Sequence, residues 1–126
     1  GAQSPSGFLD MKALGFPVVD GTSSPLFNEM PMQLFPAARR VNFVTVSMCS
    51  GIERDARQLE ARTRGAVENM EGAAVAHVGH LHQVPVGEVR GISNMVTTRD
   101  KSAWKIKEAA EAAQRALLEW LSKELR

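Results

Sequence analysis

After residue 40 the sequence alternates between short apolar runs rich in β-branched residues and longer segments with helical patterning. This alternation restricts the fold more than any other feature, because a strand–helix–strand order favours a parallel sheet covered by helices. We expect strands at residues 41–48, 66–69 and 84–92, and helices from Ser50 to about Arg64, at 71–82 and at 101–125. The sequence therefore predicts a layered α/β fold, in which a largely parallel or mixed sheet is flanked by helices and is incomplete at three strands.

The first 40 residues do not follow this order. They contain five of the six prolines, which break helices, and several glycines, which permit turns. They predict loops with short extended pieces. Because so long an irregular segment is unusual in a compact domain, we expect it to pack against protein outside residues 1–126.

Charge and composition exclude several classes of partner. The formal net charge is +1, with 15 Lys and Arg against 14 Asp and Glu, so no surface for nucleic acid or membrane is indicated. No apolar run approaches the ~20 residues of a membrane-spanning helix. Cys49 is the single cysteine, which rules out an internal disulfide and favours the reducing cytoplasm.

Ligands of such folds bind in the loops that follow the carboxyl ends of the strands. In the first such loop, Ser50 and Glu53 have the spacing of a capping box, in which each side chain bonds the backbone N–H of the other residue. In the second loop, Glu71 stands where a helix begins. A carboxylate in that place is stabilised by the free N–H groups of the helix, or it accepts hydrogen bonds from ligand hydroxyls such as a ribose diol. Local physics alone favours the first interpretation and leaves the second open.

The segment Val-Glu-Asn-Met-Glu-Gly-Ala-Ala-Val-Ala-His, residues 67–77, resembles the signature of the nucleoside phosphorylase and nucleosidase family. The resemblance implies that Met70 packs against the ribose of a nucleoside and that Glu71 holds its hydroxyl groups. Asn69 stands where relatives often have another glutamate, so the resemblance places it at the substrate as well.

A second match lies downstream, where Val-Arg-Gly-Ile-Ser-Asn, residues 89–94, resembles the family's strand end Arg-x-Ile-Ser-Asp. The aspartate of that pattern bonds the purine and helps to protonate N7, and this sequence has Asn94 instead. An amide donates an N–H to O6 or N7 and accepts one from N1, which suits a 6-oxopurine better than adenine. The resemblance thus implies a catalytic contact of Asn94 with the base. The alternative is a loop-start residue that bonds its own backbone.

Within the family, the futalosine hydrolase branch is the most similar, through Asn-Met-Glu-Gly-Ala-Ala, the Ser-Asn ending and the stretch from Arg99 to Trp104. This resemblance implies cleavage of the N-glycosidic bond of futalosine, with release of hypoxanthine, in the alternative menaquinone pathway of bacteria. Trp104 has the spacing of an aromatic residue that covers the base, or else begins the apolar face of the last helix. Ser50 lies near the family's base-contacting loop, although a helix cap already accounts for it.

Two other residue types have simpler explanations. His77, His80 and His82 lack a carboxylate or thiolate that would complete a metal site, so we expect neither a metal nor another cofactor. Cys49 has no base beside it, and we expect a small buried thiol rather than a nucleophile.

The resemblance is strongest over residues 41–126, and we expect residues 1–126 to be the C-terminal part of one nucleoside phosphorylase-like domain. In relatives, a general base or a phosphate-binding set comes from the N-terminal half, so we expect this part to be inactive without that half. Relatives usually pair or form rings, which implies a cytoplasmic homo-oligomer that takes a small-molecule purine nucleoside. Two alternatives stay open. One is a purine nucleoside phosphorylase or a methylthioadenosine/adenosylhomocysteine nucleosidase-like enzyme, and the other is a non-catalytic ligand- or subunit-binding module.

Overall fold

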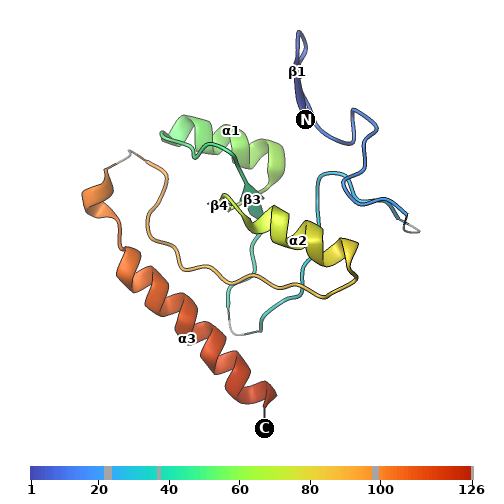
Figure 1. Ribbon diagram of the computed structural model, residues 1–126. Coiled ribbons are helices and arrows are strands. Elements are labelled where there is room, and N and C mark those ends of the chain that lie inside the picture. Colours follow the sequence, from blue (N-terminus) through green and yellow to red (C-terminus); the bar gives the residue numbers. More distant parts are fainter. Residues whose placement is uncertain (22–23, 37, 98–99, 126) are drawn as a thin grey trace. The chain divides into compact units, whose positions relative to one another are not determined.

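The structure is a computed structural model, and it describes residues 1–21, 24–36, 38–97 and 100–125 (Figure 1). Short strands and longer helices follow one another along the chain in this order: β1 (Ala2–Ser4), β2 (Gly7–Leu9), β3 (Phe43–Thr45), α1 (Glu53–Thr63), β4 (Val67–Asn69), α2 (Gly72–Leu81), the 3₁₀ turn η1 (Lys101–Ala103) and α3 (Ile106–Glu124). The expected α/β class is confirmed, with one small parallel and one small antiparallel sheet besides the helices.

The backbone packs into two compact units. One unit comprises Gly1–Gln33 and Ala73–Val86, and it contains β1, β2 and all but the first residue of α2. The other comprises Leu34–Gly72 and Gly87–Arg126, and it contains β3, α1, β4, η1 and α3. The candidate site described below lies within this second unit.

The second unit is built on a β–α–β crossover. Strands β3 and β4 are parallel, with Phe43 opposite Val67 and Thr45 opposite Asn69, and α1 connects them (Figure 1). The first strand, the helix and the second strand were each expected, although β3 is shorter than the eight-residue run that predicts it. Because both strands run in one direction, their carboxyl ends meet at the same edge and bring the loops after Thr45 and Asn69 together.

The ends of α1 differ from the prediction. The N-cap residue is Ile52 and no side chain caps the helix, so the Ser50–Glu53 capping box is wrong. Glu53 instead accepts a hydrogen bond from Arg57 Nε at 2.9 Å, one turn further on, which uses the side chain that was expected to reach back. At the other end the helix finishes close to the expected place, and its C-cap residue Arg64 is left-handed, with φ of 58°.

The third expected strand is also wrong. In the part of the chain that the structure describes, residues 84–92 form no strand. Pro85 has no N–H to give to a ladder. At Gly91 the segment lies directly against the backbone of Ala109 in α3, where an added Cβ would overlap the helix carbonyl group. Packing on a helix thus replaces pairing with a strand, and the apolar composition of the segment fits both.

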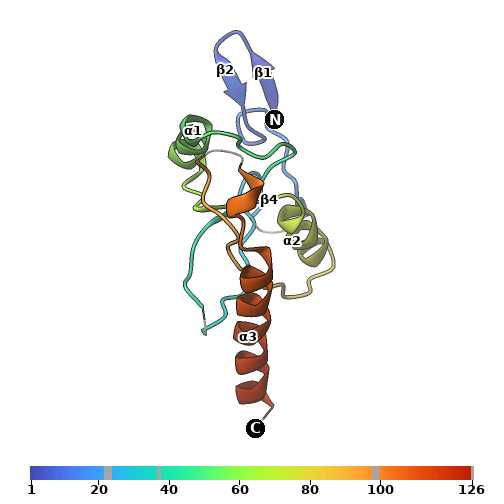
Figure 2. The ribbon, with the colours of Figure 1, turned by 90° about the vertical axis from the view of Figure 1, so that its left-hand side faces the viewer.

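The opening 40 residues contain the short extended pieces that were expected. Strands β1 and β2 form an antiparallel hairpin, with Ala2 opposite Leu9 and Ser4 opposite Gly7 (Figure 2). A single bridge joins Val19 to Leu26.

The last helical segment is divided. Asp100 caps η1 by accepting from Ser102 N–H at 2.9 Å, and α3 begins only at Ile106. Trp120 of α3 packs edge-to-face on Phe35, with ring centroids 4.8 Å apart and an interplanar angle of 85°.

Among the described residues, the buried apolar side chains are Val19, Ala76 and Ala109. No described helix combines the length and the apolar character that crossing a membrane requires.

Candidate functional site

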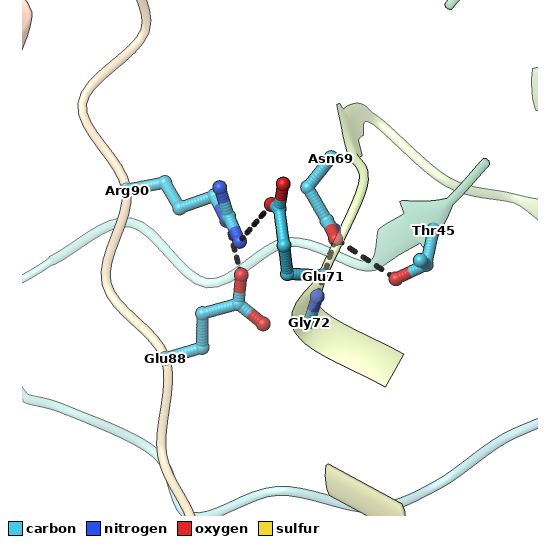
Figure 3. A network of polar contacts seen from close by, with 6 residues as sticks. All are labelled: Thr45, Asn69, Glu71, Gly72, Glu88 and Arg90. Atoms are coloured by element: carbon cyan, nitrogen blue, oxygen red, sulfur yellow. Dashed lines mark hydrogen bonds and ion pairs between the residues drawn. The ribbon is translucent and has the colours of Figure 1, made fainter. Parts of the chain in front are cut away.

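The turn between β4 and α2 is held by a buried amide. Asn69, which is 6% exposed, accepts two hydrogen bonds at Oδ1, one from Thr45 Oγ1 at 2.8 Å and one from the backbone N–H of Gly72 at 2.8 Å (Figure 3). The first bond joins the ends of the two parallel strands, and the second satisfies the first free N–H of α2. One side chain therefore fixes where Met70 and Glu71, the two residues of the turn, are placed.

Those two residues are presented to solvent. Met70 is 50% exposed, and the side chain of Glu71 is 73% exposed. A carboxylate just before the first residue of a helix also benefits from the positive end of the helix dipole. The turn thus has a rigid base and an accessible acidic group, which is the arrangement needed to accept hydrogen bonds from ligand hydroxyls.

A guanidinium group lies beside this carboxylate. Arg90 Nη2 is 3.8 Å from Glu71 Oε2, and Arg90 Nε donates to Glu88 Oε1 (Figure 3). The side chain of Glu88 is only 13% exposed, so this second carboxylate anchors the cation. One positive charge between two negative ones lowers the mutual repulsion of the two carboxylates.

The residue before Asn69 reaches a different loop. Because side chains alternate along a strand, Glu68 points away from Asn69, and its Oε2 accepts the backbone N–H of Ser50 at 2.9 Å. Within the described residues, two buried side-chain atoms lack a hydrogen-bond partner, Glu68 Oε1 and Asn69 Nδ2. Native structures have few such atoms, and here both belong to consecutive residues at the end of β4.

Asn94 makes local contacts. Its Oδ1 accepts from Ser93 Oγ at 2.7 Å, and its Nδ2 donates to the carbonyl of Met95 at 3.3 Å. The carbonyl of Ser93 accepts from Lys105 N–H at 2.8 Å, so the segment is fixed just before α3. These bonds are those of the loop-start alternative. The contact with a purine base stays a prediction.

The other predicted residues are distributed around this turn and the neighbouring segments. Trp104 is half-buried and is the residue after η1, so it precedes α3 and is not part of that helix. Ser50 is tied by its backbone to Glu68, and its side chain is not a helix cap. Arg99 lies outside the described residues. The structure thus brings Asn69, Met70 and Glu71 together in one turn.

Sequence reasoning missed three members of the network, Thr45, Glu88 and Arg90. Glu88 and Arg90 are two residues apart in an extended segment, a spacing that puts side chains on one side. That spacing was the available signal, but nothing in it shows which acid of the chain the arginine meets. Thr45 gave no signal, because the predicted strand continued to residue 48 and the observed one ends at Thr45.

Two smaller expectations can be compared with the structure. Cys49 is exposed, so the expectation of a buried thiol is wrong, because residues 47–49 of the loop after β3 are all exposed to solvent. His80 Nε2 lies 2.8 Å from the carbonyl oxygen of Pro31, a contact between side chain and backbone. In the described ranges no group of three or more His, Cys, Asp and Glu residues could hold a metal ion.

One carboxyl group outside the turn has a perturbed pKa. Hydrogen bonds from the Ser102 hydroxyl, at 2.6 Å, and from the Ser102 backbone N–H lower the pKa of Asp100 below its usual value. Asp100 directly precedes the segment that carries Trp104. The charged form of the residue therefore holds η1 in place.

Residues 21–122 match the family described as the phosphorylase superfamily. The chain belongs to the phosphorylase superfamily. Among curated proteins it is 39% identical over 114 residues to the futalosine hydrolase of Streptomyces coelicolor, a match that covers 89% of this chain and 48% of the relative. The β4–α2 turn lies inside the segment that matches the superfamily, residues 21–122.

Two further curated proteins match over a similar share of the chain, at lower identity. Identity to the futalosine hydrolase of Thermus thermophilus is 32% over 119 residues, covering 88% of this chain and 53% of the relative. Identity to that of Acidothermus cellulolyticus is 34% over 121 residues, covering 92% and 50%. The chain spans about half the length of these curated relatives. No solved structure matches it.

Proposed function

We propose that the protein carrying this sequence hydrolyses the N-glycosidic bond of a 6-oxopurine nucleoside, with futalosine as the substrate and hypoxanthine as the base released. The observation that supports this most is the exposed Glu71 carboxylate, held beside Arg90 at the β4–α2 turn. The chain that carries this turn is 32–39% identical to three futalosine hydrolases. The reaction would belong to menaquinone biosynthesis.

In this proposal Glu71 and Asn94 have separate roles. Glu71 accepts hydrogen bonds from the 2′- and 3′-hydroxyls of the ribose, while Met70 packs against the sugar. The bond between C1′ and N9 breaks, the ribosyl group gains positive charge, and the electron pair goes to the purine. The Asn94 amide donates to O6 or N7 of the departing base and so stabilises its negative charge. A water then attacks C1′, and its proton balances the charge on the purine.

The polar groups of the turn are consistent with this division of labour. The hydrogen bond that Arg90 donates to Glu88 keeps the guanidinium close to Glu71. A cation at that place favours orientations of the carboxylate in which it can accept hydrogen bonds from the hydroxyls. The amide of Asn94 is also held in one orientation, because Ser93 Oγ donates to Oδ1. Its N–H group is then directed by the loop and does not depend on free rotation.

The test is a cleavage assay on the natural protein that carries this sequence, with futalosine and with inosine, in the presence and absence of phosphate. Release of hypoxanthine from futalosine without phosphate is expected. Cleavage that requires phosphate would identify a phosphorylase instead. No cleavage of any purine nucleoside under either condition would replace the enzyme by a binding module.

A variant ties the activity to the turn. Glu71→Ala is expected to lower kcat/KM by about a hundredfold or more, because two hydrogen bonds to a charged group are worth about 1.5–3 kcal/mol each. The free energy of unfolding should fall by only about 1 kcal/mol, because the helix dipole and an exposed ion pair each contribute little. The matched control is Glu119→Ala, an exposed glutamate of α3. Equal kinetics of the two variants would remove Glu71 from the site.

A further inference from the structure

The loop between β3 and α1 is tied to the rest of the molecule by Glu68. The backbone N–H of Ser50 donates to Glu68 Oε2 at 2.9 Å in a partly buried position. Among the described residues, this is the one hydrogen bond that residues 47–51 make. The loop otherwise extends into solvent, with Met48 85% exposed. The position of the loop therefore depends on a single acceptor.

That acceptor is held in an unfavourable state. Glu68 Oε1 is buried and has no hydrogen-bond partner, and a buried carboxylate oxygen without a partner costs free energy. Rotation of the side chain into water would satisfy this oxygen but would release Ser50. The bond from Oε2 to a backbone N–H is charge-assisted, and it opposes that rotation. A carboxylate kept in such a place indicates that the bond to Ser50 matters more than the hydration of Oε1.

The same strand carries the turn with the exposed carboxylate. Glu68 is three residues before Glu71, and between them Asn69 fixes the turn through Thr45 and Gly72. The loop and the carboxylate are thus both positioned by the end of β4. A ligand that lies against both would be sensitive to their separation.

We propose that Glu68 is a positioning residue of the nucleoside site, which holds the loop at Ser50 beside the turn at Glu71 and so sets the binding of the base. This inference rests on the proposed function and extends it, because it adds a residue that positions the loop at Ser50. Glu68 does not touch the substrate, since its free oxygen is buried. It acts through the backbone of Ser50.

The experiment compares Glu68→Ala and Glu68→Gln in the natural protein, with Glu119→Ala as the matched control on α3. Exchange of the Ser50 amide hydrogen is followed by NMR, and kcat and KM are measured with the purine nucleoside. In Glu68→Ala we expect Ser50 to exchange about tenfold faster and KM to rise about tenfold, with kcat within about threefold. Glu68→Gln should restore both values to within about threefold, because the glutamine oxygen accepts the same N–H. A role in stability alone would not shift KM in this selective way.

Other outcomes decide against the proposal. Unchanged Ser50 exchange in Glu68→Ala overturns the tether, and faster exchange with an unchanged KM overturns its role in binding. Should Glu68→Ala fail to fold, Glu68→Asp, whose carboxylate is one methylene too short, is expected to give the same two effects. If the unsubstituted protein cleaves no nucleoside, the proposed function fails. Calorimetric titration with hypoxanthine then tests the positioning role by itself. The role is overturned if Glu68→Ala and the unsubstituted protein bind hypoxanthine with the same Kd, or if neither binds it.

Discussion

Arg90 Nη2 lies 3.8 Å from Glu71 Oε2, and Nε of the same guanidinium bonds the largely buried Glu88. The exposed carboxylate of the turn is thereby linked to a fixed one on the segment that leads to Asn94. A free glutamate side chain samples many rotamers and loses that entropy on binding a ligand. We infer that Arg90 reduces this loss, because a cation beside Glu71 favours the orientations that keep the ion pair. We therefore assign Arg90 a positioning role.

Replacement of this arginine tests the role. Arg90→Met is expected to raise KM about three- to tenfold, because Glu71 loses its orienting cation. Stability should fall by about 1–3 kcal/mol, mainly because Glu88 keeps a partly buried charge without its partner. The pair with Glu71 adds little, since exposed ion pairs contribute about 0–1 kcal/mol. Steady-state kinetics and urea unfolding measure the two effects. Arg115→Met on α3 is the control, and identical kinetics in both variants would contradict the assignment.

The β3–α1–β4 crossover and the β4–α2 turn could be predicted because their signals are local. An apolar run, a helical period and an acid at a helix start each lie within a few consecutive residues. The polar network around the turn could not be predicted from the sequence. Arg90 and Glu71 are far apart in the sequence, and their pairing depends on how two segments pack together. The capping box failed for a related reason. The pattern Ser50–Glu53 is compatible with a cap. In the structure, however, the Ser50 N–H donates to Glu68, and the Glu53 carboxylate accepts a hydrogen bond from Arg57.

Residues 84–92 show the limit of patterning in another way. Apolar and β-branched composition predicts burial on an extended backbone, and it does not specify the partner. Here α3 lies against Gly91 where a strand was expected. The buried Asn69 is likewise bonded by Thr45, which lies 24 residues earlier in the sequence. No local sequence pattern predicts a contact over that separation.

Substitution of Asn94 separates a base contact from a local turn. Asn94→Asp should lower kcat/KM for a 6-oxopurine nucleoside about tenfold or more, because a carboxylate repels O6 where the amide donates to it. The same variant should lose less with a 6-amino nucleoside. Asn28→Asp is the control, since Asn28 Oδ1 accepts from Met11 N–H and an aspartate keeps that acceptor. Equal losses on both nucleosides would favour the local turn, in which Asn94 serves only Ser93 and Met95.

Close approach of the backbone at Gly91 predicts a stability effect. An alanine Cβ at this position would overlap the carbonyl group of Ala109, so Gly91→Ala should destabilise the protein by at least about 2 kcal/mol, within the range known for overpacked sites. Gly51→Ala is the matched control, because nothing lies within 4 Å of its added Cβ. That change should be neutral, or stabilising by up to about 1 kcal/mol through the unfolded state. Guanidinium unfolding measures both, and equal midpoints would show that α3 does not pack at Gly91.

The hydrogen bonds between Ser102 and Asp100 predict a pH-dependent effect. The Ser102 hydroxyl is the main cause of the lowered pKa of Asp100, and the backbone N–H adds to it. In Ser102→Ala the pKa of Asp100 should therefore rise toward its usual value, as followed by NMR titration of the carboxyl carbon. Ser122→Ala, which removes a hydroxyl bonded to the Glu119 carbonyl, should leave the Asp100 pKa unchanged.

The sign of the stability change follows from the direction of this shift. A carboxyl group whose pKa is lowered by folding stabilises the folded state above its unfolded pKa, and this contribution is lost as the pH falls through the lower, folded value. Ser102→Ala should thus be less stable than the unsubstituted protein at pH 7. The difference should shrink as the pH falls below about 4, the ordinary value for aspartate. Urea unfolding at pH 7 and pH 3 measures it. A difference of the same size at both pH values would mean that Ser102 stabilises η1 without acting through the charge of Asp100.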